Sequence, residues 1–181
     1  ISSAETVSAN VGAGGGAGVQ KASKVSPAAA GSGAGGEKGF SGAKMAARGR
    51  GALVLLSSLT AFQGSPFVTT YGATKAFNLA FAEGLWFELK SSGVEVLSVC
   101  AGATRTPNLL KPAPNGAPGM LEPAQVVTEA LDALGGGPTM IPGAFNRVAS
   151  FFMRKVLTRK ATISIMGDQT KKLQNPKALP R

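Results

Sequence analysis

The sequence contains no histidine and a single cysteine, Cys100, among its 181 residues. These absences exclude Ser-His-Asp and Cys-His nucleophiles, histidine-based metal sites, disulfide frameworks and cysteine-cluster metal sites, so we expect no bound metal. Acid–base chemistry must fall to Tyr71, the only tyrosine, or to lysine and carboxylate side chains. Because there is no possible disulfide, signal peptide or long apolar run, we predict a cytoplasmic setting.

Large apolar side chains are scarce at the N-terminus. Between Ile1 and Phe40 there is no leucine, methionine or aromatic residue, and valine occurs only at four scattered positions. Such a stretch cannot bury enough apolar surface to offset the conformational entropy of its chain. We therefore expect residues 1–39 to be a disordered, low-complexity segment rich in alanine and glycine, and the globular part to begin near residue 40.

Acidic residues are scarce at the C-terminus, where residues 141–181 carry nine basic side chains and one acidic one. The stretch "FNRVASFFMRKVLTRK" places apolar residues at near-helical spacing with basic residues between them. This pattern predicts that residues 144–181 form a basic helix and tail, docked on the domain or in weak contact with a membrane surface or an acidic partner. No helix-turn-helix, aromatic platform or zinc module accompanies the charge, so we expect no specific nucleic-acid binding.

Residues 40–143 alternate strand patterns with helix patterns. "ALVLLSS" (52–58) and "VEVLSVCAG" (94–102) are short apolar runs typical of buried parallel strands. Residues 69–93 between them show helical spacing closed by Gly93, residues 122–134 form a second helical pattern, and "PTMI" (138–141) suits a last short strand. The alternation predicts an α/β fold with a parallel sheet, whose binding crevice lies at the carboxyl ends of the strands.

A candidate catalytic group lies at that predicted crevice. Ser58 ends the first strand, and residues 102–106 follow the second, so both should open onto the same edge of the sheet. Tyr71 and Lys75 are four residues apart and share one helical face. A nearby ammonium stabilises a phenolate, which makes tyrosine a usable acid or base near neutral pH.

A second motif suggests a different enzyme class. Ser41-Gly42-Ala43-Lys44 fits the Ser-x-x-Lys pattern of some hydrolases, but the Ser-Asp-Asn and Lys-Thr-Gly elements that accompany it are absent. The end of a helix before a strand explains the same residues without chemistry. The hydrolase is therefore a minor alternative.

From about residue 40 to residue 120 the chain resembles the short-chain dehydrogenase/reductase family. "YGATK" fits the family's Tyr-x-x-x-Lys motif, and Ser58 stands thirteen residues before Tyr71, as the family's catalytic serine commonly does. "AGATRT" fits the Pro-Gly-x-x-x-Thr element, with Ala101 in place of the proline. The resemblance covers the catalytic C-terminal half of the family. It implies a partial Rossmann-type, doubly wound parallel sheet with flanking helices, NAD or NADP as cofactor, and hydride transfer between an alcohol and a ketone.

The resemblance also implies roles for single residues. Tyr71 would donate and accept the proton, Ser58 would position the carbonyl oxygen, and Lys75 would support the tyrosine and bond the nicotinamide ribose. Further positions would line the cofactor, namely Gly102, Thr104 and Thr106. Three apolar residues would belong to a mobile substrate lid, namely Leu109, Leu110 and Met120. The implied substrate is a small, hydrophobic alcohol or ketone, and helix 70–90 is a possible surface for homo-oligomers.

The family's cofactor half is not recognisable in this chain. Family members open with a strand and a Gly-x-x-x-Gly-x-Gly loop that places backbone N–H groups against the pyrophosphate. Residues 12–18 fit that spacing, but only about forty residues separate Gly18 from Ser58, too few for the intervening βαβ units. Residues 10–12, Asn-Val-Gly, weakly echo the family's Asn-Ala-Gly element.

Two expectations follow from the missing half. The chain should bind NAD(P) weakly or not at all, and the strand "ALVLLSS" (52–58) should be an unpaired apolar edge. The alternative to an active oxidoreductase is a non-catalytic fragment or pseudoenzyme of the family whose basic tail binds a partner or a membrane surface.

Overall fold

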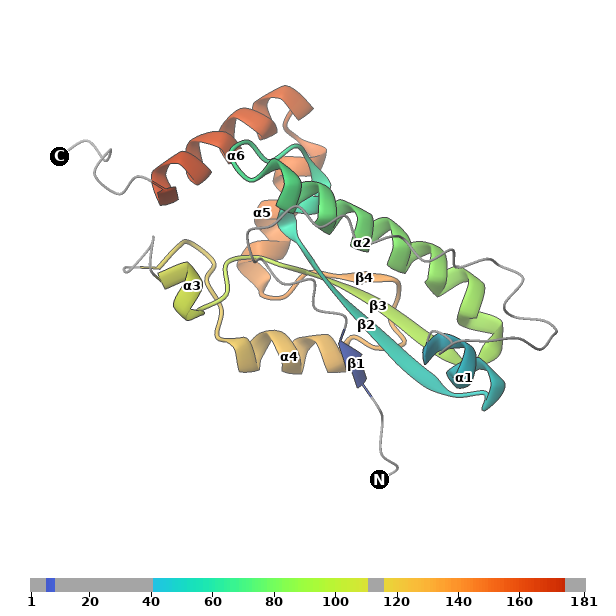
Figure 1. Cartoon of the computed structure of the whole chain (residues 1–181). Coiled ribbons are helices and arrows are strands. Elements are labelled where there is room, and N and C mark those ends of the chain that lie inside the picture. Colours follow the sequence, from blue (N-terminus) through green and yellow to red (C-terminus); the bar gives the residue numbers. More distant parts are fainter. Residues whose placement is uncertain (1–5, 9–40, 111–115, 175–181) are drawn as a thin grey trace.

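The computed structural model describes residues 6–8, 41–110 and 116–174 (Figure 1). Its strands form one parallel sheet in the order β1-β2-β3-β4, and their bounds are β1 Thr6–Ser8, β2 Gly51–Ser58, β3 Val94–Ala101 and β4 Thr139–Met140. The helices are α1 Ser41–Ala47, η2 Leu59–Phe62, α2 Thr69–Leu89, η3 Lys90–Ser92, α3 Pro107–Leu110, α4 Pro123–Asp132, α5 Ala144–Lys155 and α6 Arg159–Gln174. The predicted partial Rossmann-type α/β fold with a parallel sheet and flanking helices is confirmed.

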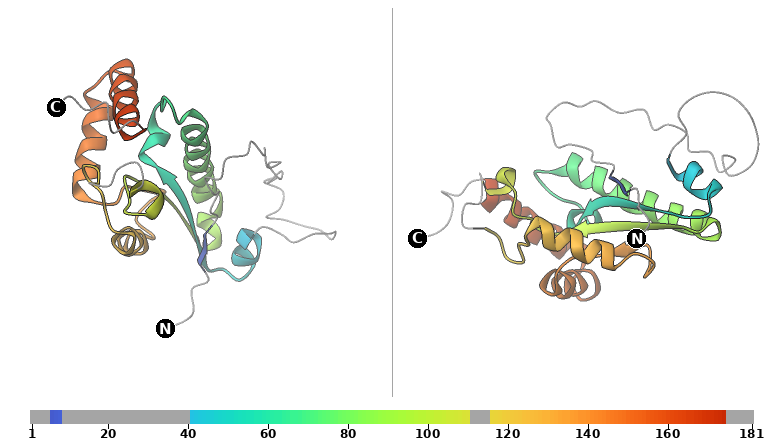
Figure 2. Two further views of the ribbon diagram at one scale, coloured as in Figure 1. Left: turned by 60° about the vertical axis from the view of Figure 1, so that its left-hand side comes forward. Right: turned by 90° about the horizontal axis from the view of Figure 1, so that it is seen from below.

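Helices cover both faces of the sheet, with α1 and α2 on one side and α4 on the other (Figure 2). The first face is packed from Met45, Leu53, Leu55, Ala82, Leu85, Val94 and Val96. The second is packed from Leu97, Val99, Val126 and Ala130, with Val54 and Leu56 against them. Successive strand residues point to opposite faces, so a strand covered on both faces needs an unbroken apolar run. This explains why "ALVLLSS" shows no alternation.

The N-terminal segment contributes a strand that the sequence did not predict. Strand β1 runs parallel to β2, with Thr6 opposite Ala52 and Ser8 opposite Val54. A parallel ladder is made of main-chain hydrogen bonds, so a strand can form without the large side chains that this segment lacks. The expectation that residues 52–58 form an unpaired edge is therefore wrong over residues 52–54. Residues 1–5 and 9–40, which include the glycine-rich stretch 12–18, lie outside the described residues.

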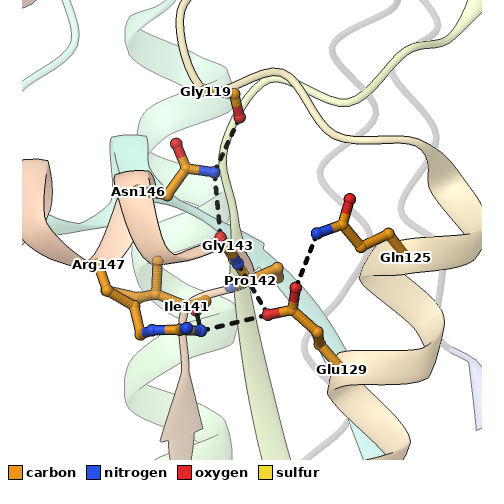
Figure 3. A network of polar contacts seen from close by, with 8 residues as sticks. All are labelled: Gly119, Gln125, Glu129, Ile141, Pro142, Gly143, Asn146 and Arg147. Atoms are coloured by element: carbon orange, nitrogen blue, oxygen red, sulfur yellow. Dashed lines mark hydrogen bonds and ion pairs between the residues drawn. The ribbon is translucent and has the colours of Figure 1, made fainter.

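The chain beyond β4 forms two helices, α5 and α6, and a polar network attaches the start of α5 (Figure 3). The Glu129 carboxylate on α4 accepts hydrogen bonds from the Gly143 backbone N–H at 2.8 Å and from Arg147 Nη1 at 3.2 Å. The bond from Gly143 is the main reason why the pKa of Glu129 lies below its ordinary value, and Gln125 adds a second hydrogen bond. Asn146 Nδ2 donates to the Gly119 and Pro142 carbonyls, both at 3.0 Å. These bonds fix the start of α5 against α4 and the loop that contains Gly119.

None of the helices in the described ranges combines the length and the apolar character needed to cross a membrane.

Candidate active site

The end of β2 carries two buried serines with different partners. The Ser58 hydroxyl oxygen accepts a hydrogen bond from the Thr60 backbone N–H at 3.2 Å and so caps the short helix η2. Because that oxygen acts as an acceptor, its own hydrogen remains available for another oxygen. The Ser57 hydroxyl instead donates to the Lys75 carbonyl at 2.7 Å. Ser58 is thus oriented by its own loop, whereas Ser57 joins the strand to α2.

Tyr71 and Lys75 occupy successive turns at the start of α2. The Lys75 side chain is 8% exposed, and its Nζ donates to the Leu56 carbonyl at 3.0 Å, which brings the ammonium to the end of β2. The same Nζ lies 5.5 Å from the centroid of the Tyr71 ring, while the Tyr71 side chain remains 41% exposed. Burial lowers the pKa of Lys75, since desolvation disfavours its charged form. A charged lysine, a solvent-accessible phenol and the end of β2 therefore meet in one place.

Asn78 is part of this arrangement, although the sequence did not single it out. Its Nδ2 donates to the Leu56 carbonyl at 3.1 Å, the same oxygen that Lys75 Nζ contacts. Together with the Ser57 bond to the Lys75 carbonyl, this links strand and helix in both directions. The available signal was a polar residue, three positions after Lys75 on the same helical face, inside the apolar run "AFNLAFA".

The cofactor-lining candidates follow β3 at the same edge of the sheet. Ser58 pairs with Ala101 in the strand register, so Gly102 begins beside the end of β2. The Thr104 hydroxyl donates to the Gly102 carbonyl at 3.3 Å, and the Thr106 hydroxyl accepts from the Leu109 N–H at 3.4 Å. Both threonine side chains thus make local bonds that shape the loop after β3.

Gly102 is required by its packing against α5. A Cβ atom at this position would lie 2.9 Å from Asn146 Nδ2, closer than real Cβ contacts. Asn146 therefore defines the wall behind the loop after β3. No sequence pattern indicates Asn146, because its contacts with Gly102 and Gly119 join segments far apart in the chain.

The three candidate lid residues lie on a segment whose two ends are tied together. Leu121 forms a parallel bridge with Thr104, donating to the Ala103 carbonyl at 3.0 Å and accepting from the Arg105 N–H at 2.8 Å. The candidates Leu109, Leu110 and Met120 are all half-buried. Residues 111–115 between them lie outside the described residues.

The alternative Ser-x-x-Lys motif lies at the other end of the sheet. Helix α1 packs at the amino end of β2, where a Cβ on Gly51 would overlap the Met45 side chain, and Lys44 on this helix is exposed. Ser58 is at the carboxyl end of the same strand. In the described part of the chain, no group of three or more His, Cys, Asp or Glu side chains could hold a metal ion.

Comparison with known proteins identifies the family. Residues 41–114 match the family model described as short chain dehydrogenase. A 7beta-hydroxysteroid dehydrogenase of Collinsella aerofaciens is 38% identical over 128 residues, which are 67% of this chain and 49% of that protein. A solved structure from work on 7beta-hydroxysteroid dehydrogenase stereoselectivity has a TM-score of 0.63 at 34% identity, covering 68% of this chain and 50% of the other. The chain belongs to the short-chain dehydrogenase/reductase family.

Other members of the short-chain dehydrogenase/reductase family match over the same part. A 7beta-hydroxysteroid dehydrogenase of Mediterraneibacter gnavus is 34% identical, again over 67% of this chain and 49% of that protein. A short chain dehydrogenase of Burkholderia cenocepacia, solved in complex with NADP, has a TM-score of 0.56 at 26% identity and covers 70% of this chain and 51% of the other. The chain thus spans about half the length of the curated relatives it matches.

Proposed function

We propose that the chain carries the catalytic half of an NAD(P)-dependent oxidoreductase that interconverts a hydroxysteroid and its ketone. The observation that carries this proposal is the Lys75 ammonium, held at the end of β2 by the Leu56 carbonyl and 5.5 Å from the Tyr71 ring. The choice of substrate class rests on the 38% identity with a 7beta-hydroxysteroid dehydrogenase.

The side chains at this edge fit the nicotinamide end of a dinucleotide. Lys75 has three N–H donors and uses one on the Leu56 carbonyl, which leaves donors for ribose hydroxyls. Gly102, Thr104 and Thr106 form the loop that would border the nicotinamide and the neighbouring phosphates. When bound, the cofactor supplies or takes up the hydride.

The proton step follows from three side chains. In ketone reduction, Ser58 donates its hydroxyl hydrogen to the carbonyl oxygen and holds it, while Tyr71 Oη transfers its proton to the same oxygen. The phenolate left on Tyr71 is stabilised by the Lys75 charge in a partly desolvated setting. Because the Tyr71 side chain is 41% exposed, water can return the proton. General acid catalysis of this kind contributes about 10²- to 10⁴-fold to the rate.

Apolar side chains on the segment after β3 suit a hydrophobic substrate. Leu109, Leu110 and Met120 are half-buried on the segment tied to Thr104 through Leu121. Half-buried leucine and methionine can still cover apolar surface of a bound molecule, and apolar contact is the main source of affinity for a ring system with few polar atoms. We assign them to the substrate wall.

We expect this chain to have a low affinity for the cofactor. The glycine loop and the adenine pocket normally supply much of a dinucleotide's binding free energy, and the half of the family that carries them is not recognisable in this sequence. Losing several charge-assisted hydrogen bonds at about 1.5–3 kcal/mol each should raise the dissociation constant from the micromolar range to above the millimolar range. We therefore expect dissociation constants for NADH and NADPH above about 100 μM by isothermal titration. A tighter site would show that the N-terminal residues build a working cofactor site.

The activity test is oxidation of NADPH or NADH, at millimolar concentration, with a 7-ketosteroid as acceptor. Tyr71→Phe should lower turnover about 10²- to 10⁴-fold, because it removes the proton donor and keeps the ring. Ser91→Ala, at an exposed serine beyond the far end of α2, is the control and should leave turnover unchanged. Equal turnover by Tyr71→Phe and the unchanged chain would rule out the assigned chemistry. No turnover by the unchanged chain would favour the non-catalytic alternative.

A further inference from the structure

Helix α5 presents its aromatic side chains outward. It buries two polar residues, Asn146 at 4% exposure and Ser150 at 2%. Four of its large apolar residues and its C-cap valine are more than half exposed, and we call these five the outer face of α5: Phe145 59%, Val148 69%, Phe151 64%, Phe152 54% and Val156 57%. Met153, the other large apolar residue of α5, is half-buried. An amphipathic helix of a globular domain normally turns its apolar stripe toward the core, so α5 has the reverse orientation.

The hydrogen bonds at the start of α5 fix this orientation. Asn146 is held inward by the Gly119 and Pro142 carbonyls, and Arg147 is held by the Glu129 carboxylate (Figure 3). Turning the aromatic face inward would break these bonds and bury unpaired carbonyls. An exposed group of aromatic and aliphatic side chains on a fixed helix indicates a surface for a partner.

The charges around this face restrict the partner. Lys155, Arg159 and Lys160 are exposed at the end of α5 and the start of α6, and in the described ranges none of them pairs with a carboxylate. The sequence has no acidic residue between Asp132 and Asp168. The face thus combines exposed aromatic rings with cations that lack counter-charges.

A second copy of this chain would not supply those counter-charges. Pairing two outer faces would bring two sets of cations together without an acidic residue between them, which opposes association.

The helices α5 and α6 also lie on the side of the molecule away from β1 and α1 (Figure 2). The sheet order, with β1 and β4 at opposite edges, agrees with this placement.

We propose that the outer face of α5 binds the surface of an anionic lipid bilayer. The phenylalanine and valine side chains enter the boundary between headgroups and acyl chains, and Lys155, Arg159 and Lys160 contact the lipid phosphates. A bilayer of this kind offers both an apolar layer and the missing negative charge, as interfacial amphipathic helices require. The inference does not depend on catalytic activity.

Flotation with vesicles tests the proposal. The chain should float with vesicles of phosphatidylcholine containing about 30% phosphatidylglycerol, far less with phosphatidylcholine alone, and less as salt rises from about 0.05 to 0.5 M. Phe145→Ser combined with Phe152→Ser should lower the partition coefficient at least about tenfold, because the variant loses two aromatic rings that enter the bilayer. Lys155→Glu should lower it more than about fivefold. Equal binding to vesicles with and without phosphatidylglycerol would overturn the proposal.

Matched variants separate this face from general adhesion. Val148→Ser on α5 should weaken vesicle binding, whereas Val127→Ser on α4, at another valine that is more than half exposed, should not. Lys44→Glu on α1 should likewise have a smaller effect than Lys155→Glu. All these side chains are exposed, so circular dichroism should show a retained fold. Equal losses at both valines would contradict the proposal, as would light scattering that shows a dimer lost in Phe145→Ser.

Discussion

Helices α2 and α5 both bury polar side chains, but they obtain their stability in different ways. Helix α2 buries Lys75 and Asn78 against one strand carbonyl, and the rest of its inner face is Leu79, Ala82 and Leu85 in the core. Helix α5 buries Asn146 and Ser150 and leaves its aromatic residues outside. The cost of polar burial in α2 is offset by apolar packing on the same helix. In α5 the burial of Asn146 is offset by its hydrogen bonds to the Gly119 and Pro142 carbonyls, which leaves the outer face available to a partner.

The largest expected effect is the difference in stability lost when a buried apolar residue of α2 and an exposed one of α5 are truncated. Leu85→Ala should lower the free energy of unfolding by about 2–5 kcal/mol, because Leu85 is 4% exposed and its removal leaves a cavity between α2 and the sheet. Phe152→Ala on α5 should cost less than about 1 kcal/mol although it deletes a larger side chain. Urea unfolding followed by circular dichroism measures both. Similar losses for the two variants would mean that the outer face of α5 is packed against the protein in solution.

The second effect concerns the polar anchor of α5. Asn146→Ala should lower the free energy of unfolding by about 1–3 kcal/mol, since the Gly119 and Pro142 carbonyls lose their donor. Gln169→Ala, at an exposed amide on α6, is the control. Thermal unfolding of the two variants and the unchanged chain measures the loss of stability. If Asn146→Ala matches the control, the hydrogen bonds at the start of α5 do not hold this helix.

Sequence patterns predicted the parts of the molecule whose structure depends on residues close together in the chain. Strand 52–58 and the shared helical face of Tyr71 and Lys75 depend on residues near each other in sequence, where periodicity is informative. Side-chain bonds to distant carbonyls were harder to predict: Asn146 left no local pattern, and the signal for Asn78 was a single polar residue inside an apolar helical run. Strand β1 was missed because main-chain pairing needs no particular side chain. The roles of Ser58, Tyr71 and Lys75 in catalysis remain predictions that the activity assay tests.

A smaller effect concerns the stability that the Glu129 carboxylate contributes and its loss at low pH. The pKa of Glu129 is lowered mainly by the Gly143 N–H, so this carboxylate stabilises the fold above its ordinary pKa, and the contribution is lost as pH falls through the folded-state pKa. Glu129→Gln should therefore cost about 1 kcal/mol at pH 7, where a charge-assisted bond becomes neutral. The difference should shrink toward pH 3. Glu88→Gln, at an exposed glutamate on α2, is the control, and a pH-independent difference would contradict the assignment.

The smallest effect concerns the buried lysine of α2 and has the opposite pH dependence. Burial lowers the pKa of Lys75 below its ordinary value of 10.5, so between the folded-state pKa and 10.5 the unfolded chain binds more protons than the folded one. Stability contributed by this residue should therefore rise with pH through that window, because neutral lysine costs less to bury and still donates to the Leu56 carbonyl. Lys75→Met removes the titrating group and should lose this rise, whereas Lys44→Met at an exposed lysine should keep it. Urea unfolding of the three proteins between pH 7 and the ordinary lysine pKa measures the difference. Parallel curves for Lys75→Met and the unchanged chain would mean that Lys75 is hydrated in solution, and the desolvated ammonium on which the Tyr71 chemistry depends would be lost with it.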